Sequence, residues 1–509
     1  MNVKAITILA FACSGMFGGA SRPAHGDATA AEDPGAIRVR SFQPEKPLSR
    51  ARRPTRITAV VENTGKRDVV VGPALVCPPG VRALHLPDAR VTLRAGRGAT
   101  TTTLKWDIEA DTEMRAKLWL GLKSGNNVST SATLSMLFLP PVEMRKAPYV
   151  PESVPVKTDV LVGALNCPLW EPNDPTWNFL PKHPERTPAL GVYDQSNPEV
   201  ADWETKWAVE HGISFFVYCW YRASKGDAVE TKYSSAIDAL LKSRYVDKFK
   251  FAIMWENQPR DAAKWGRSGV TDEKDLIGNL MPFWMANYFK HPSYLTVDNK
   301  PLLFIYDAHQ LAHQLGGPRN VPKAFERMRQ ACKREGFAGL YLLGEYRGLE
   351  PKELQFRKDM GFDYVFPYVW PVGEPWRPVE MQVDYMRKAQ ETRIIPWVLT
   401  ASQGWSGWND QPARYLYTLS PRDYEGLLRK AKEFIATRPH NELGSRMLLL
   451  DDWNEWGEGH YIAPHRQYGF GYLDAVRKVF SNAPERHVDL LPEDIGLGPY
   501  DSAYKTHKK

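Results

Sequence analysis

Alternation of apolar and polar positions dominates the first part of the chain, from residue 37 to residue 140. Ile57, Ala59 and Val61 are separated by polar residues, and Asn63-Thr64-Gly65 then provides turn-forming residues. Period-two alternation with frequent turns is typical of antiparallel strands that bury one face, and no helical periodicity competes with it. We therefore predict an all-β, immunoglobulin-like sandwich over residues 37–140.

From residue 160 onward, short apolar runs alternate with segments whose apolar residues recur three and four positions apart. The runs are Val160–Leu165, Ile213–Trp220, Phe249–Trp255, Leu302–Tyr306, Leu340–Leu343, Tyr364–Tyr368, Ile394–Leu399 and Met447–Leu450. Eight strands separated by amphipathic helices are typical of an α/β (β/α)8 TIM barrel, which we predict over residues 159–482. A doubly wound open sheet is the alternative. The count of eight favours the barrel, as does the lack of a Gly-rich phosphate loop after the first strand.

The remaining segments are predicted to connect the two domains, to close the barrel, to cover its surface and to direct export. Residues 141–158 are proline-rich and should form a stiff linker, a helix at 471–480 should close the barrel, and the tail at 483–509 should lie over the surface. Residues 1–26 resemble a secretory signal peptide, with Lys4 before a short apolar run and small residues after it. The mature protein is therefore expected to be soluble and secreted or periplasmic. Phe11 stands where a lipoprotein signal carries a small residue, which disfavours lipidation at Cys13.

Composition adds a preference for a ligand that stacks on aromatic rings. Of the 17 Trp residues, 15 lie beyond residue 160, many of them beside polar residues at predicted strand ends. The formal net charge of +7 comes without a Lys/Arg run, which argues against nucleic acid. Four cysteines remain after the signal segment, and their spacing fits no metal site. A disulfide between Cys167 and Cys219 is geometrically possible, but four buried free thiols are preferred.

Polar and aromatic residues follow all eight predicted strands, where a barrel of this type carries its active site. Any single one could be a helix cap or an ion-pair partner, but the recurrence at every strand end favours a site. The substrate-binding candidates from these ends are Trp220, Tyr221, Glu256, Asn257, Tyr306, Asp307, Glu345, Trp370 and Trp405.

The eighth strand runs into the densest cluster of such residues, DDWNEWGEGH at residues 451–460. Glu455 and Glu458 are three positions apart and should project from one side of a helical turn. Cleavage of a glycosidic bond needs two carboxyl groups, so we predict these two as catalytic. Ion pairing of either with His460, His465 or Arg466 is the structural alternative. Asn454, Trp456 and His460 complete the predicted binding set.

A metal ion is the competing use of these carboxylates. Asp451, Asp452 and Glu455 could hold a hard cation, but the chain has neither an EF-hand loop nor an HExxH helix. We therefore expect no catalytic metal and no cofactor.

Three motifs carry a resemblance to a known family. NEWGEGHYIAP at 454–464 is similar to the NEW-x-E-G signature of glycoside hydrolase family 99 and the related WbsX-like domains. The stretch 191–222, from GVYDQS to FVYCWYR, resembles the family's opening segment, and KPLLFIYD at 300–307 resembles its fourth strand. The resemblance covers roughly residues 160–480, the predicted barrel alone.

This resemblance implies a (β/α)8 barrel with retaining, endo-acting cleavage of α-mannosidic linkages. It implies that Glu455 is a base acting on the sugar's 2-hydroxyl, that Glu458 is the acid/base, and that Tyr306 lines the site. Gly457 replaces the usual His, and Ala463 replaces the usual Glu. The first strand ends in Asn166-Cys167-Pro168 rather than a Tyr-rich run. The glutamates therefore transfer to this chain, whereas mannose specificity does not.

These observations support three hypotheses about function. The leading one is an exported, monomeric glycoside hydrolase that cleaves bonds within a carbohydrate chain. A glycosyltransferase of the WbsX-like type is the second, and it is disfavoured by export away from nucleotide sugars and by the lack of an Asp-x-Asp motif. The third is a glycan-binding barrel without catalytic activity, which retention of both glutamates disfavours.

Overall fold

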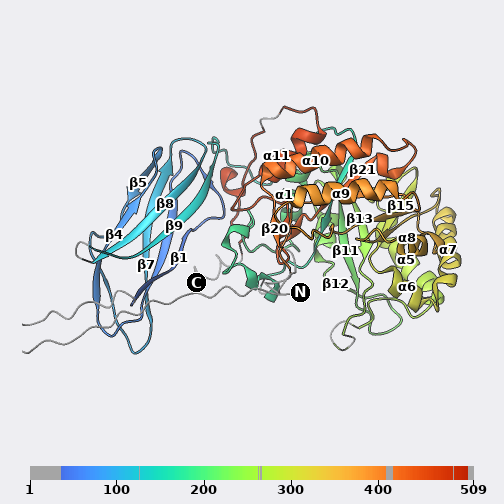
Figure 1. Cartoon of the computed structure of the whole chain (residues 1–509), viewed down its shortest axis with the longest axis horizontal. Coiled ribbons are helices and arrows are strands. Elements are labelled where there is room, and N and C mark those ends of the chain that lie inside the picture. Colours follow the sequence, from blue (N-terminus) through green and yellow to red (C-terminus); the bar gives the residue numbers. More distant parts are fainter. Residues whose placement is uncertain are drawn as a thin grey trace, which may run out of the picture.

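The computed structural model describes residues 36–124, 127–172, 174–261, 263, 266–407, 416–484 and 487–501. An all-β domain lies at one end of the long axis and a helix-covered parallel sheet at the other (Figure 1). The predicted signal segment, Cys13 and the last part of the predicted tail lie outside these residues. None of the helices within the described ranges combines the length and hydrophobicity that crossing a membrane requires.

Two sheets with one shared core form the N-terminal domain. One sheet consists, in spatial order, of β1 (Ile37–Pro44), β3 (Thr55–Asn63), β7 (Thr100–Ala110) and β5 (Val81–His85). The other consists of β2 (Ser49–Arg50), β9 (Asn127–Leu139), β8 (Met114–Ser124), β4 (Val69–Val76) and β6 (Val91–Leu93). Ile57 and Trp106 of the first sheet share a buried cluster with Leu120 and Phe138 of the second. The alternating pattern thus predicted antiparallel strands correctly, because each strand buries every second side chain.

Eight parallel strands form the second domain and follow one another around a closed sheet. They are β10 (Leu161–Asn166), β11 (Phe215–Arg222), β13 (Lys250–Trp255), β15 (Lys300–Ile305), β16 (Tyr341–Glu345), β17 (Tyr364–Phe366), β18 (Leu399–Ser402) and β21 (Met447–Asp451). Each pairs with the next except β17 and β18, and β21 pairs with both β10 and β18. The gap between β17 and β18 is bridged just before β18, where Val365 pairs with Trp397. The sheet therefore fits the predicted TIM-barrel-like architecture.

Seven of these strands begin and end within two residues of their predicted bounds. The prediction of the seventh strand at Ile394–Leu399 was wrong: the observed strand, β18, begins only at Leu399. Pro396 explains the difference, since proline has no N–H to donate to a ladder. Its carbonyl instead accepts a bond of 3.0 Å from the N–H of Val365.

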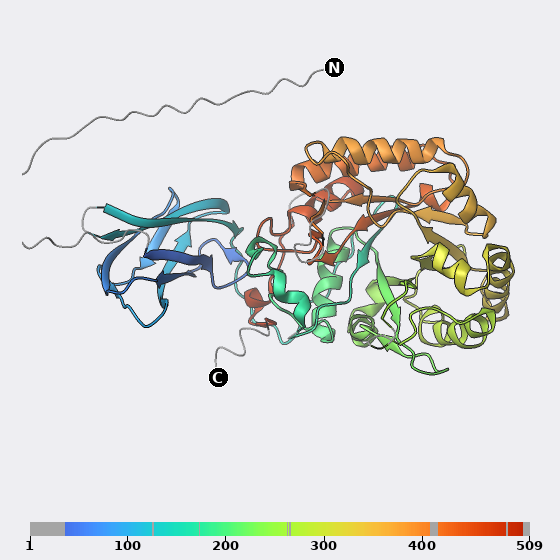
Figure 2. The same cartoon turned by 60° about the horizontal axis from the view of Figure 1, so that its bottom comes forward.

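Helices surround the closed sheet (Figure 2). The α-helices are α1 (Pro198–Glu210), α2 (Ser235–Lys242), α4 (Glu273–Asp275), α5 (Met281–Trp284), α6 (Ala308–Gln314), α7 (Val321–Arg334), α8 (Pro351–Asp359), α9 (Pro378–Glu391), α10 (Pro421–Ala436) and α11 (Gly471–Phe480). The π-helical turns η4 (Leu276–Leu280) and η5 (Met285–Phe289) flank α5. Short 3-10 turns are η1 (Pro175–Phe179), η2 (Pro184–Arg186), η3 (Val246–Lys248), η6 (Pro318–Asn320), η8 (Leu443–Ser445) and η9 (Pro492–Ile495). Two-residue strands are β12 (Thr231–Lys232), β14 (Thr296–Val297), β19 (Gly404–Trp405), β20 (Tyr417–Thr418), β22 (Asn454–Glu455) and β23 (His460–Tyr461).

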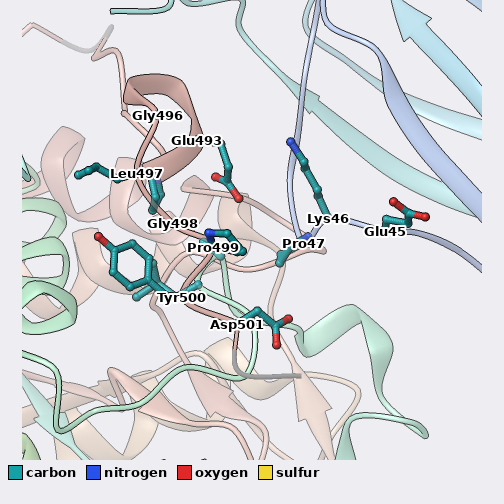
Figure 3. Close-up of a pocket in the computed structure, with 13 residues that line it drawn as sticks. Glu45, Lys46, Pro47, Glu493, Gly496, Leu497, Gly498, Pro499, Tyr500 and Asp501 are labelled. Atoms are coloured by element: carbon teal, nitrogen blue, oxygen red, sulfur yellow. The ribbon is translucent and has the colours of Figure 1, made fainter. Parts of the chain in front are cut away.

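The C-terminal segment 487–501 does not lie over the surface as expected, because it packs between the two domains. Leu491 and Ile495 are buried in the core of the barrel domain. Buried Asp494 accepts hydrogen bonds of 2.9 and 3.0 Å from Nε of Arg50, a residue of the sandwich, and Arg53 also binds it. A cavity of about 300 Å³ remains beside this contact (Figure 3). The segment therefore links the sandwich to the barrel.

The described cysteines match the preference for free thiols. Cys77, Cys167, Cys219 and Cys332 are unpaired in the structure, and all but half-buried Cys77 are buried. Burial raises the pKa of the Cys167 and Cys219 thiols well above its usual value. These two thiols are therefore neutral and chemically unreactive at ordinary pH.

Asp494→Ala is expected to lower the free energy of unfolding by about 3–5 kcal/mol, because it leaves the buried Arg50 guanidinium without its partner. Urea denaturation followed by circular dichroism measures this loss. Asp384→Ala is the matched control, since it breaks an exposed pair with Arg387 and should cost about 1 kcal/mol or less. Equal losses for both variants would contradict the role assigned to Asp494.

Candidate active site

A β-hairpin follows β21 and carries both predicted catalytic residues. Strand β22 pairs antiparallel with β23, so that Glu455 lies opposite His460. The four residues between them close with a bond of 3.1 Å from the Gly459 N–H to the Glu455 carbonyl. The predicted helical turn is therefore only this single turn, contained in a hairpin. Glu458 lies on the turn and Glu455 at its base.

Glycine is required at Gly459 for conformation and for space. Its φ of +76° lies in the left-handed region, and a Cβ there would stand 2.4 Å from Oγ of Ser406. The N–H of Ser406 donates a 2.6 Å bond to the Glu458 carbonyl. The segment after β18 is thereby packed against the turn that carries Glu458, and it brings Trp405 over His460 with ring centroids 5.0 Å apart.

His460 joins two acidic residues. Its Nδ1 lies 2.8 Å from Oδ1 of Asp451, and its Nε2 lies 2.9 Å from Oε2 of Glu458. Ser402 donates a hydrogen bond of 2.9 Å to the other oxygen of Asp451. Burial disfavours the imidazolium, but the charges of Asp451 and Glu458 outweigh it and raise the pKa of His460 well above its usual value. A charged His460 therefore donates to both carboxylates.

Glu455 and Glu458 differ in their surroundings. Glu455 is 4% exposed, and its Oε1 has no hydrogen-bond partner. Burial, and next the neighbouring Glu458 carboxylate, raise the pKa of Glu455 to about 8. The Glu458 side chain is 24% exposed and is bound by His460. A buried carboxyl oxygen without a partner points to a ligand, because such a group is costly unless something binds it.

A second buried carboxyl group, Asp452, lies beside this pair. It accepts a hydrogen bond of 3.0 Å from the Tyr368 hydroxyl and one of 3.1 Å from the Asn454 N–H. Burial raises its pKa well above the ordinary value, although His460 opposes the rise. Asp451, Asp452 and His460 offer atoms close enough to share a cation. Protein groups already bind each of the three, so the site is held together by its own hydrogen bonds.

Arg347 brings a positive charge to the same region. Its Nε donates a 2.7 Å bond to Glu345, and its NH2 group donates to the Tyr306 hydroxyl. Its guanidinium lies 5.3 Å from the centroid of the Tyr368 ring. Burial opposes its charge, but nearby acidic groups, Glu345 first and Glu458 also, raise its pKa. The ends of β15, β16, β17 and β21 therefore meet around one cation.

The ends of β11 and β13 contribute a third set of groups. Glu256 forms an ion pair with Arg260, and its buried Oε1 has no hydrogen-bond partner. Arg260 lies 5.5 Å from the centroid of the Tyr221 ring. Burial raises the pKa of Glu256 even though Arg260 opposes it. Two hydrogen bonds of 2.8 Å join the Asn257 side chain to the Asp307 backbone, so the end of β13 adjoins the end of β15 and the group around Arg347.

The structure thus brings together Glu455, Glu458, His460, Tyr306, Glu345, Tyr221, Glu256 and Trp405 among the predicted residues. Trp220 and Trp370 lie elsewhere. Trp220 donates to the Tyr288 hydroxyl and packs on Trp284, and Trp370 donates to the Thr400 carbonyl and stacks on Tyr385. Successive residues of a strand point to opposite faces, so Tyr221 faces the site and Trp220 faces the helices.

Three predicted binding residues instead bond to backbone groups outside the site: Asn257, Asp307 and Asn454. Asn257 and Asp307 exchange two bonds of 2.8 Å, and Asp307 also caps α6. Asn454 accepts from the Cys167 N–H at 2.8 Å, which fixes the end of β10. Buried Trp456 donates to the Tyr193 hydroxyl, and its ring packs at a tilt on that of Tyr461, with centroids 4.6 Å apart.

Arg347 and Tyr368 lie near the ends of predicted strands but were not among the predicted binding residues. Their position just beyond β16 and β17 was the available signal. Arg347 stands between Tyr346 and Gly348, and Tyr368 ends an apolar run. Their role becomes visible only when the strands are side by side.

Comparison with known proteins places the barrel in a family. A family model described as Glycosyltransferase WbsX matches residues 178–476. The chain is 26% identical over 336 residues to the protein named Uncharacterized protein WxcX from Xanthomonas campestris pv. campestris strain B100. That match covers 59% of this chain and 44% of the relative, so the chain spans less than half of its length.

Two solved structures are similar at a lower level. The GH99 endo-α-mannosidase from Bacteroides thetaiotaomicron, in complex with bis-tris propane, matches with 14% identity and a TM-score of 0.46, over 63% of this chain and 96% of that chain. A β-glucuronidase from Ruminococcus gnavus, bound to an N1-substituted uronic isofagomine, matches with 11% identity and a TM-score of 0.34, over 87% and 67%. Neither match defines a reaction or a sugar for this chain.

Stability should fall as pH rises from 5 to 8, because folded Glu455 keeps its proton up to about pH 8 whereas an unfolded glutamate releases it near 4.5. Glu455→Gln does not titrate. Its free energy of unfolding relative to wild type should therefore rise by about 1–3 kcal/mol between pH 5 and pH 8. Denaturant titrations at both pH values measure the change. Glu433→Gln, at an exposed pair with Lys430, should show no such pH dependence; an equally flat Glu455→Gln difference would refute the assignment.

Proposed function

The chain belongs to the WbsX glycosyltransferase family. From the geometry of its candidate site we propose that it is a glycoside hydrolase. The observation that carries the proposal is the pair of carboxyl groups on one hairpin. Glu455 is buried with an unpartnered oxygen, and Glu458 is partly exposed and bound by His460. Two carboxyl groups in unlike surroundings are what acid–base cleavage of a glycosidic bond requires.

The proposed substrate is an α-linked carbohydrate cleaved within the chain and with retention of configuration. Trp405, Tyr306 and Tyr221 provide rings that a sugar can stack on or hydrogen-bond to, and Glu256 adds an acceptor without a partner. The signal-like residues 1–26 support a reaction outside the cytoplasm, by a protein that acts as a monomer. The identity of the sugar does not follow, because Cys167 and Ala463 replace residues usual in the resembling hydrolases.

Glu455 is the proposed base and Glu458 the proposed acid. Glu455 takes the proton of the sugar's 2-hydroxyl, and that oxygen attacks the anomeric carbon to form an epoxide. Glu458 protonates the departing oxygen, and water then opens the epoxide with the two roles reversed. A base with a pKa of about 8 is a stronger proton acceptor than an ordinary glutamate. Because Glu458 accepts the Nε2–H of the charged His460, this imidazolium supplies the proton that Glu458 passes to the departing oxygen.

Glycosyl transfer is the second candidate, and the description of the family model favours it. The same two carboxyl groups could activate an acceptor hydroxyl in place of water. Product analysis separates the two activities: hydrolysis gives new reducing ends without an acceptor sugar, whereas transfer gives a longer glycan only when one is supplied.

The sandwich is proposed to support the barrel rather than to catalyse. We infer that it is immunoglobulin-like, because β1, β3, β7 and β5 follow the strand order of one immunoglobulin sheet, and β9, β8 and β4 follow the other. The domain departs from the immunoglobulin pattern in one respect. Along the chain, β5 at the edge of the first sheet comes before β6 at the edge of the second. The bond from Arg50 to Asp494 holds this domain against the barrel.

Glu458→Gln should lower the rate of glycan cleavage by about 10²–10⁴-fold, because the leaving oxygen loses its proton donor. Purified protein is tested on a panel of α-linked glycans by assay of reducing ends. Glu433→Gln controls for the loss of a surface carboxylate and should retain wild-type activity. Cleavage by Glu458→Gln at the wild-type rate would refute the catalytic assignment.

The pH dependence of cleavage distinguishes the two roles. If Glu455 is the base, kcat/KM should rise with pH up to about 8, as this group loses its proton. Glu458→Gln should also regain activity on aryl glycosides whose leaving group needs no proton, whereas Glu455→Gln should not. A rate that falls as pH rises toward 8, with recovery in Glu455→Gln instead, would reverse the roles.

A further inference from the structure

A second cluster of ionisable groups lies where α1 ends, α11 begins and the C-terminal segment passes. His211 follows the last residue of α1, Asp474 is in the first turn of α11, and Asp489 lies on the segment 487–501. One nitrogen or oxygen atom from each of the three lies within 4.8 Å of the others. The cluster shares no residue with the candidate active site, so a ligand bound there would be independent of the proposed reaction.

His211 is oriented as a metal ligand would be. Its ring is fully buried, and Nδ1 lies 2.7 Å from the Trp207 carbonyl, which fixes the proton on that nitrogen. Nε2 is therefore left with a lone pair, and it has no hydrogen-bond partner. Buried Asp489 also has an unpartnered oxygen, Oδ1. Two buried acceptors that face each other without a donor need a positive charge between them.

The spacing of the three groups fits a cation better than direct hydrogen bonds. Nε2 of His211 lies 3.5 Å from Oδ1 of Asp489 and 3.6 Å from Oδ1 of Asp474. Charge-assisted hydrogen bonds are shorter, at about 2.7–2.9 Å. In a tetrahedral zinc site with bonds of about 2.1 Å, neighbouring ligand atoms stand about 3.4 Å apart.

We propose that His211, Asp474 and Asp489 bind one Zn²⁺ ion, with water as the fourth ligand. One imidazole and two carboxylates are a ligand set that suits zinc, and their two negative charges balance the ion. The Asp474 side chain is 52% exposed, which gives solvent and metal access to the site.

A second histidine, His487, lies beside the three proposed metal ligands. His487 lies with Nε2 3.5 Å from Asp489 Oδ1 and 3.2 Å from Glu210 Oε2. Its ring meets that of His211 edge-on, with centroids 5.3 Å apart. His487 is therefore hydrogen-bonded to Glu210, which holds its imidazole beside the proposed ligands.

The ion would join three parts of the barrel domain that are distant in sequence. It would tie the first barrel helix to the last and both to the segment that carries Asp494, the partner of Arg50. The site is thus structural, and loss of the metal should lower stability without changing the geometry of the catalytic hairpin.

A proton is the competing occupant. Burial disfavours a charged His211, but Asp489 and Asp474 outweigh it and raise the pKa of His211 to about 10. A protonated imidazole would balance the same carboxylates, so the experiment must distinguish an ion pair from a metal site.

The test uses the full chain without a histidine tag, stripped with a chelator, loaded with Zn²⁺ and dialysed. Elemental analysis should find about one Zn²⁺ per chain, and Zn²⁺ should raise the Tm of the stripped protein by about 3–6 °C. His211→Gln and the half-exposed Asp474→Asn should each bind less than about 0.2 equivalents. Bound Co²⁺ in place of Zn²⁺ should show the visible absorption of a four-coordinate site, and the two variants should lose it.

Matched controls are His440→Gln and Asp359→Asn, two exposed residues of the same types outside the cluster, which should retain full binding. Because Asp474 is on the surface, its variant tests the site even if His211→Gln does not fold. Wild-type protein that binds no stoichiometric Zn²⁺ would overturn the proposal. Full zinc binding by Asp474→Asn would also overturn it. So would a loss of stability in this variant, relative to wild type, that is the same with and without Zn²⁺.

Discussion

The hydrogen-bonded chain from Asp451 through His460 to Glu458 is the interaction on which the candidate active site depends. All three groups sit at the end of β21, and two of them are fully buried. An isolated charge there would be prohibitively costly, but a charged imidazole between two carboxylates satisfies both of its nitrogens. The chain also orients Glu458, because one of its oxygens is held 2.9 Å from His460. Loss of the imidazole would therefore leave a buried Asp451 without its main partner and would release Glu458 from its position.

Burying so many acidic groups costs free energy, and nearby positive charge offsets only part of that cost. The part that is not offset appears as raised pKa values, which suit acid–base chemistry. Arg347, Arg260 and His460 supply positive charge, yet Asp452 and Glu455 still have pKa values raised by burial. A fold selected for stability alone would replace such groups with apolar side chains. These groups gather in one place with oxygens of Glu455 and Glu256 left unbound, which is the pattern expected of a site whose ligand supplies the missing partners.

Much of this arrangement could be predicted from the sequence, because apolar runs set the strands and strand ends set the site. The position of Glu455 and Glu458 needed only the rule that barrel active sites lie at the carboxyl ends of strands. Trp220 was misplaced because the face that a strand residue occupies depends on register, and a shift of one position reverses it. Trp370 lies in the segment beyond β17 and packs against Tyr385 of α9. Arg347 was missed because its partners, Tyr306 and Tyr368, come from other strands. The burial of segment 487–501 could not be predicted either, since its contacts are with the sandwich and with α1.

Backbone contacts from three separate segments hold the hairpin that carries Glu455 and Glu458, and this explains how a short turn can position two carboxyl groups. The N–H of Trp453 donates a 2.7 Å bond to the carbonyl of Leu165, and the N–H of Ser406 donates to the carbonyl of Glu458. On the far side, the N–H of Ala189 donates a 2.8 Å bond to the Pro464 carbonyl. A loop fixed at its start, its turn and its exit loses little entropy when a substrate binds, so binding energy is not spent on ordering it. The charged side chains are thereby held on a rigid support, even though the residues themselves belong to an irregular stretch of the chain.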